Sequence, residues 1–204
     1  MSMPSRSLIL AEPVDIEATK KRLWDVFQSW RDVSDLSFVF DETRPEDQGV
    51  VVDVWWAPTQ EIPLDIRLVD DRVADTRYLS VVTDDEDRSR DLVARLADEF
   101  PTVSISDLLE QARSPQPGPH ALMRLGLGLS GEPSEEAVSL IRDGLDSPQD
   151  ATRDDAAEAA AVYRRPELVP DLEAALAGET DPVRRQKLDV ALQLSRPSTS
   201  GEAE

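Results

Sequence analysis

Apolar residues recur at helical spacing near the start of the chain. A short apolar run over residues 7–13 ends at Pro13 and predicts a strand. Asp15 is then suited to cap a helix, because its carboxylate can accept a backbone N–H of the first turn. The apolar face of that helix consists of Ile16, Thr19, Leu23, Val26, Phe27 and Trp30. We expect an amphipathic helix that packs on a flat surface.

The following segments alternate between apolar and polar residues, as strands do. Residues 36–40 and 50–56 are joined by a polar loop over 41–49, which predicts a hairpin. A strand with one apolar side is also expected at 62–69, and a fourth strand at 77–83. Alternation places two groups on opposite sides of the second strand: Val50, Val52, Val54 and Trp56, against Val51, Asp53 and Trp55.

Helical spacing returns after the strands. The acidic run 84–87 opens a helix that Pro101 stops, and a short helix is expected at roughly 106–113. The predicted order over residues 1–113 is therefore β-α-β-β-β-β-α-α. This order predicts an α+β domain, an antiparallel sheet with helices on one face, for which a ferredoxin-like variant is the nearest familiar layout.

Prolines divide the rest of the chain. Residues 114–119 contain three prolines and one glycine and predict a semi-rigid linker. Residues 197–204 are polar and predict a disordered tail. Between these segments we expect the following helices: 120–130, 134–146, 151–164, 167–178 and 182–195.

The helical region repeats itself. Residues 145–165 align with residues 176–196 at an offset of 31, which places Leu145 on Leu176 and Arg153 on Arg184. A period in this range is typical of stacked helical repeats.

Two turn motifs carry a family resemblance. Asp150-Ala-Thr-Arg153 and Thr180-Asp181-Pro182-Val183-Arg184, with Pro166-Glu-Leu between them, resemble the turns of HEAT-like helical repeats. The resemblance implies a short α-solenoid of helical hairpins over residues 120–196, and binding of other proteins as its default role. Some relatives attach or handle bilin chromophores, and others excise alkylated bases from DNA with a basic concave face. Residues 119–204 hold 17 acidic and 9 basic residues, which disfavours the DNA branch.

The charge of the whole chain also disfavours binding to nucleic acid. It has 42 acidic and 22 basic residues, a net charge of −20. A field of this sign repels nucleic acid and anionic lipid and attracts a basic partner. A generally acidic proteome would account for the charge equally well. No apolar stretch approaches the ~20 residues of a membrane span, and the run 8–11 is too short for a secretory signal. We therefore expect a cytoplasmic protein.

The sequence contains few of the residues that catalysis or cofactor binding would need. There is no cysteine, and His120 is the only histidine, so neither a thiol nucleophile nor a histidine-based metal site or triad can form. The acids at 84–87 are suited to the positive end of a helix dipole. Leu125-Gly-Leu-Gly-Leu129 lacks the third glycine of a dinucleotide motif and suits close helix packing instead. We predict no catalytic residue, cofactor or metal, and we favour a protein that is not an enzyme.

The candidate partner-binding residues follow from these features. Trp55 and Trp56 must face opposite sides of the sheet, and we select Trp55 as a partner-binding anchor, with packing between domains as the alternative. The candidate acidic contacts on the second helices of the hairpins are Glu136, Asp143, Glu167 and Asp171.

The expected function is a non-catalytic module whose acidic surface docks a basic protein, for example as an immunity or antitoxin-type inhibitor of a cationic toxin or enzyme. One alternative is an accessory scaffold for assembly of a biosynthetic or secretion complex, binding through apolar helix faces. The other is an enzyme that handles a small molecule or chromophore, which would need a deep apolar pocket between the domains.

Overall fold

The computed structural model describes residues 5–34, 36–45, 49–58, 60–72, 74–115, 117–129 and 132–197. The chain divides into two compact units, Met1–Ser104 and Ile105–Glu204. The described residues form a five-stranded antiparallel sheet and eight α-helices, which confirms the α+β class. Apart from Pro197, the predicted tail lies outside the described residues.

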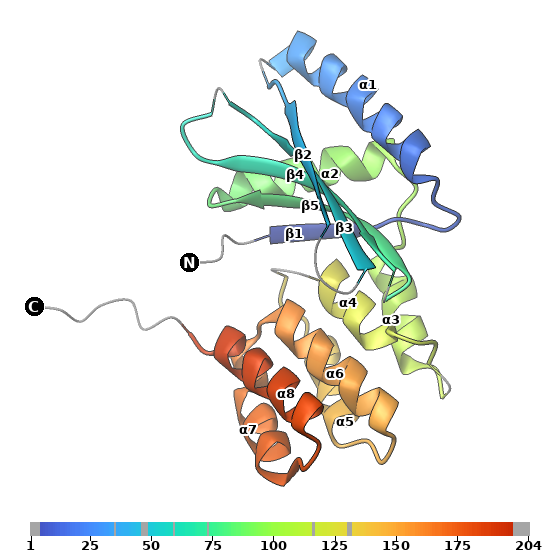
Figure 1. Ribbon diagram of the computed structural model, residues 1–204, viewed down its shortest axis with the longest axis vertical. Helices are drawn as coiled ribbons and strands as arrows, with labels where there is room; N and C mark the ends of the chain where they lie inside the picture. The colour runs from blue at the N-terminus through green and yellow to red at the C-terminus, as the bar shows by residue number, and fades with distance from the viewer. Residues whose placement is uncertain are drawn as a thin grey trace, which may run out of the picture. The chain divides into compact units, whose positions relative to one another are not determined.

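The first unit contains one sheet and two helices. Its elements are β1 (Ser5–Ile9), α1 (Ile16–Ser34), β2 (Val39–Pro45), β3 (Val50–Trp56), β4 (Leu64–Asp71), β5 (Thr76–Thr83) and α2 (Glu86–Glu99). The strands are arranged in the order β1-β5-β4-β3-β2 (Figure 1). The order of elements along the chain agrees with the prediction. The layout departs from the βαββαβ order of a ferredoxin-like unit, because the described residues from β2 to β5 contain no α-helix.

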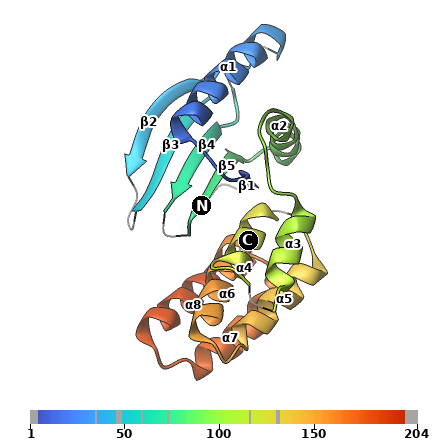
Figure 2. The same ribbon diagram turned by 90° about the vertical axis from the view of Figure 1, so that its right-hand side faces the viewer.

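Helices α1 and α2 pack on one face of this sheet (Figure 2). The register places Trp55 opposite Ile66, and Ile66 opposite Val81, so one apolar row crosses three strands. Phe27 of α1 packs on this row, with its ring centroid 6.0 Å from that of Trp55. A smaller cluster of Val52, Val54 and Val69 forms on the other face, as the alternation along β3 predicts.

The second unit is a two-layered stack of helices. Its elements are α3 (Ile105–Arg113), α4 (Ala121–Gly128), α5 (Glu135–Leu145), α6 (Asp150–Tyr163), the 3-10 turn η2 (Pro166–Leu168), α7 (Val169–Gly178) and α8 (Pro182–Ser195). Helix α6 lies between α4 and α8 (Figure 1). On the other layer α3 packs on α4, α5 on α6, and α7 on α8. Among the described residues, α4, α6 and α8 thus lie along one side of the unit, and α3, α5 and α7 pack against them.

Helix α3 belongs to this second unit, whereas the sequence pattern assigned its residues to the first domain. Its buried residues Leu108 and Ala112 lie on a helix that contacts α4 and α5. The proline-rich segment 114–119 therefore connects α3 to α4 within one unit, and the contact boundary falls between Ser104 and Ile105. Proline marks a break between elements whether or not a domain ends there.

Small residues allow α4 and α6 to approach closely. A Cβ atom added at Gly126 would lie 2.8 Å from the carbonyl oxygen of Ala159, and one added at Gly144 would lie 2.6 Å from Cδ1 of Leu122. Ala156, Ala159 and their alanine neighbours in α6 are fully buried. Gly126 of α4 and Gly144 of α5 therefore serve helix packing. Among the described helices, none combines the length and apolar character needed to cross a bilayer.

Candidate functional site

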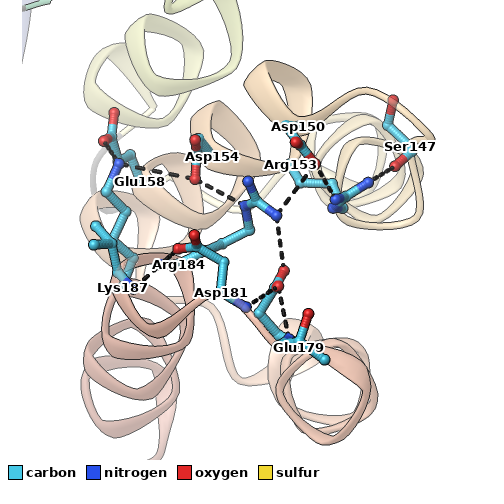
Figure 3. Close-up of polar contacts among 11 residues, drawn as sticks. Ser147, Asp150, Arg153, Asp154, Glu158, Glu179, Asp181, Arg184 and Lys187 are labelled. Carbon is cyan, nitrogen blue, oxygen red and sulfur yellow. Dashed lines mark hydrogen bonds and ion pairs between the residues drawn. The ribbon is translucent and has the colours of Figure 1, made fainter.

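A buried arginine connects helix α8 to helix α6 and to the α7–α8 turn. Arg184 of α8 is 9% exposed, and its side chain donates hydrogen bonds to Asp154 of α6 and to Glu179 in the α7–α8 turn, each at 3.0 Å (Figure 3). Burial alone would lower the pKa of Arg184, but the hydrogen bonds to Asp154 and Glu179 raise it above its ordinary value. Arg184 is thus a fixed internal cation, and these two acids are already neutralised.

A second set of contacts continues across the same layer. Lys187 of α8 donates to Glu158 of α6 at 2.7 Å (Figure 3). His120, just before α4, places Nδ1 3.8 Å from the same carboxylate. The acids on this side of α6 therefore hold neighbouring helices together and are not free for a partner.

Three of the four predicted acidic contacts are also paired within the unit. Glu136 of α5 pairs with Arg113 of α3, and Asp171 of α7 accepts from Nε of Arg142 of α5 at 3.0 Å. Glu167 accepts from Arg165 at 2.8 Å, and this hydrogen bond lowers the pKa of Glu167. Each of these carboxylates has its charge compensated by a nearby arginine.

The predicted aromatic anchor is buried in the first unit. Trp55 is 3% exposed and packs between Phe27 and Phe40, so it offers no surface to a partner. Its neighbour Trp56 is 44% exposed. The alternation placed the two rings on opposite sides correctly. Trp55, selected as the partner-binding anchor, lies in the core because its side of β3 is the side that α1 covers.

The fourth predicted acid, Asp143, lines a cavity of about 540 Å³ within the second unit. The cavity lies beside the α3–α4 segment and the α5–α6 turn, and its polar side chains include His120, Asp143, Asp146 and Asp155. Its apolar wall includes Pro115, Pro117, Pro119, Leu122, Leu140 and Pro148. Asp143 and Asp146 are exposed, and neither has an ion pair within the described part of the chain. The cavity thus combines apolar walls with two uncompensated carboxylates.

Asp155 has a structural role at this cavity. Its carboxylate accepts the backbone N–H groups of Leu122 and Met123, both at 3.0 Å, at the first turn of α4. Burial raises the pKa of Asp155, while the two backbone hydrogen bonds and His120 oppose the change. His120 has a left-handed backbone with φ of 59°, and its Nδ1 is buried without a hydrogen-bond partner among the described residues.

A second cavity, of about 470 Å³, lies on the other side of the α5–α6 turn and shares Asp146 with the first. It is also lined by Arg153, Arg184 and Glu179. Two arginines make it a poor site for a cation, and Glu179 is saturated by Arg184 and by the backbone N–H groups of Thr180 and Asp181.

The arrangement of the first cavity suits a positively charged group. Its polar side chains offer hydrogen-bond acceptors, and none of its lining residues carries a fixed positive charge. Among the described residues no group of three or more histidine, cysteine or acidic side chains has the geometry to hold a metal ion. The roles of Asp146 and Asp155 were not predicted, because nothing in the local sequence links Asp155 to the start of α4, 33 residues away.

No protein-family model matches this chain, and neither the curated proteins nor the solved structures compared with it give a match.

Proposed function

We propose that the protein is a non-catalytic binding module whose second unit docks a basic protein partner. One observation carries this proposal: Asp143 and Asp146 remain uncompensated beside a cavity, whereas Glu136, Glu167 and Asp171 are paired with arginines of the same unit. A net charge of −20 would also steer a basic protein toward the molecule. A secreted or intracellular cationic toxin blocked by an immunity-type protein is one concrete form.

We also infer that the second unit is a short HEAT-like solenoid. The inference is supported by helices α4, α6 and α8 lying side by side, by the packing of α3, α5 and α7 against them, and by the 31-residue offset. Equivalent arginines support it as well, because each bonds to the turn before its own helix: Arg153 donates to the backbone carbonyl of Ser147, and Arg184 donates to the carboxylate of Glu179. Repeat arrays of this kind commonly present extended binding surfaces.

Affinity capture tests the proposed function. The immobilised full chain is incubated with lysate of its own source, and captured proteins are identified with and without about 0.5 M salt, which shortens the screening length several-fold. The variant D143N/D146N removes the free carboxylates. The control E135Q/D189N makes the same change in net charge at exposed positions outside the cavity lining.

We expect the unmodified chain and the control to capture a protein rich in lysine and arginine, and D143N/D146N or high salt to abolish the capture. Capture of acidic proteins only, or capture that neither salt nor D143N/D146N weakens, would contradict the proposal.

A scaffold function is the second candidate, and a specific surface favours it. Val183, Val190 and Leu194 are exposed on α8 and lie at spacings that place them along one side of the helix. Binding through this stripe would persist in high salt and would be lost in V190K. Binding through Asp143 and Asp146 would show the opposite pattern.

A further inference from the structure

We propose that the 540 Å³ cavity of the second unit receives an arginine side chain of the partner. This inference rests on the proposed function and specifies its chemistry. The cavity is bordered by the α3–α4 segment on one side and by the α5–α6 turn on the other, so a side chain entering it would contact both.

The apolar wall favours a guanidinium group over an ammonium group. Proline rings and leucine side chains provide flat surfaces without hydrogen-bonding groups, and they include Pro117, Pro148 and Leu140. A guanidinium is planar and more weakly hydrated than an ammonium, which is compact and strongly hydrated. The transfer of a guanidinium from water into this cavity would therefore cost less free energy than the transfer of an ammonium.

The polar groups of the cavity match a ligand that only donates hydrogen bonds. Asp143 and Asp146 supply carboxylates without an ion pair in the described part of the chain. The imidazole of His120 also borders the cavity, with its Nδ1 buried 3.8 Å from the carboxylate of Glu158. A guanidinium offers five N–H donors and no acceptor, so it can satisfy two carboxylates at once. An anionic or acceptor-rich ligand would leave these groups unpaired.

The neighbouring cavity does not duplicate this chemistry. Arg153 and Arg184 line it. Arg153 is held in place by Asp150, and Arg184 by Asp154 and Glu179. A second cation would meet like charge there. The inference is therefore limited to one arginine, seated between His120 and the two free aspartates.

The single histidine makes this inference directly measurable. Since His120 is the only histidine of the chain and lines the cavity, its imidazole C–H signals in proton NMR have no overlap from another histidine. N-acetyl-arginine amide is titrated into the full chain at constant ionic strength up to about 50 mM, which covers the millimolar affinity expected of a single side chain. N-acetyl-lysine amide is the comparison ligand.

We expect the His120 signals to shift saturably with the arginine ligand in the unmodified chain and in E135Q/D189N. In D143N/D146N the apparent dissociation constant should rise at least about tenfold, the change expected when two charge-assisted hydrogen-bond acceptors are lost. The lysine ligand should bind at least about threefold more weakly, because it lacks the planar fork and keeps its hydration.

Absence of a saturable shift, or equal affinity for the two ligands, or an unchanged affinity in D143N/D146N would overturn the inference. Unchanged tryptophan fluorescence and backbone amide spectra of the variant would establish that it is folded. If the arginine ligand fails while partner capture still depends on Asp143 and Asp146, only this inference is lost. If capture is independent of charge, the proposed function is lost whatever the titration shows.

Discussion

Individual side chains in the second unit divide into those that hold helices together and those left available. Arg184 belongs to the first group: it contacts Asp154 and Glu179, with Asp150 at 3.3 Å, and is almost fully buried. Asp143 and Asp146 belong to the second group. The distinction depends on the distance to the nearest opposite charge, and the spacing of charges along the sequence does not reveal that distance.

Replacing Arg184 should destabilise the second unit strongly. R184M would leave Asp154 and Glu179 close together without their cation, and we expect the free energy of unfolding to fall by about 3 kcal/mol. The control R196M removes an exposed pair with Glu173 and should cost about 0.5 kcal/mol or less. Urea unfolding followed by far-UV circular dichroism measures both, and similar values for the two variants would refute the role assigned to Arg184.

Asp155 should make stability depend on pH in a direction opposite to that of a salt-bridged acid. Its pKa is raised above 3.8 in the folded chain, so the folded state binds the proton more tightly than the unfolded state does. The contribution of Asp155 to the free energy of unfolding therefore increases as the pH falls toward its raised pKa, and decreases as the pH rises.

The measurement is the free energy of unfolding of the unmodified chain minus that of D155N, between about pH 7 and pH 4. We expect this difference to grow as the pH is lowered, since asparagine does not titrate. His120 and Glu158 both face Asp155; His120 lowers the pKa of Asp155, whereas Glu158 raises it. A difference that stays constant or shrinks on acidification would show that burial of Asp155 does not control its proton affinity.

Local chemistry predicted some of these residues and missed others. Asp15 caps α1 as expected, since its carboxylate accepts the N–H of Ala18 at 3.0 Å. The cap at the start of α4 was not predicted, because Asp155 reaches it from another helix. Trp55 and Trp56 show a third case: the alternation of sides is local information, but which side the helices cover is decided by packing.

At the scale of elements, close helix packing depends on glycine at particular positions. Gly126 lies in α4 where α6 passes, and any side chain there would collide with the backbone of Ala159. Gly178, the last residue of α7, has no atom within 4 Å of an added Cβ. These two positions allow helix propensity to be compared with packing in one molecule.

We expect G126A to lower the free energy of unfolding by about 2 kcal/mol, because overpacking outweighs the gain of roughly 1 kcal/mol in helix propensity. G178A should leave stability unchanged or raise it by about 0.5 kcal/mol, through the reduced entropy of the unfolded chain. Thermal and urea unfolding of both variants provide the comparison. A neutral G126A would mean that α4 and α6 can separate without loss.

The elements of the first unit could be predicted in order because each follows from a local period: alternation for β3 and β4, and three- and four-residue steps for α1. Their arrangement β1-β5-β4-β3-β2 could not, since strand pairing depends on contacts between distant segments. The same limit applies to α3. Its sequence lacks the turn motifs of the later helices, and only its contacts with α4 and α5 reveal that it belongs to the stack.

At the scale of the whole molecule, the net charge of −20 would act on a basic partner at long range, whereas the cavity would act on it only at short range. Charge of this size accelerates association with any basic protein but selects poorly among them. The uncompensated Asp143 and Asp146 would supply the selectivity, since they act at short range beside an apolar wall. The two contributions differ in their dependence on salt.

The most direct test of this account is the dissociation constant of the captured partner, measured by calorimetry at several salt concentrations for the full chain, D143N/D146N and E135Q/D189N. We expect D143N/D146N to weaken binding by about 100-fold, from the loss of two short-range charge pairs, and E135Q/D189N by no more than about threefold, from the reduced long-range field. If both double variants weaken binding equally, the cavity is not the docking site, and the central claim is contradicted.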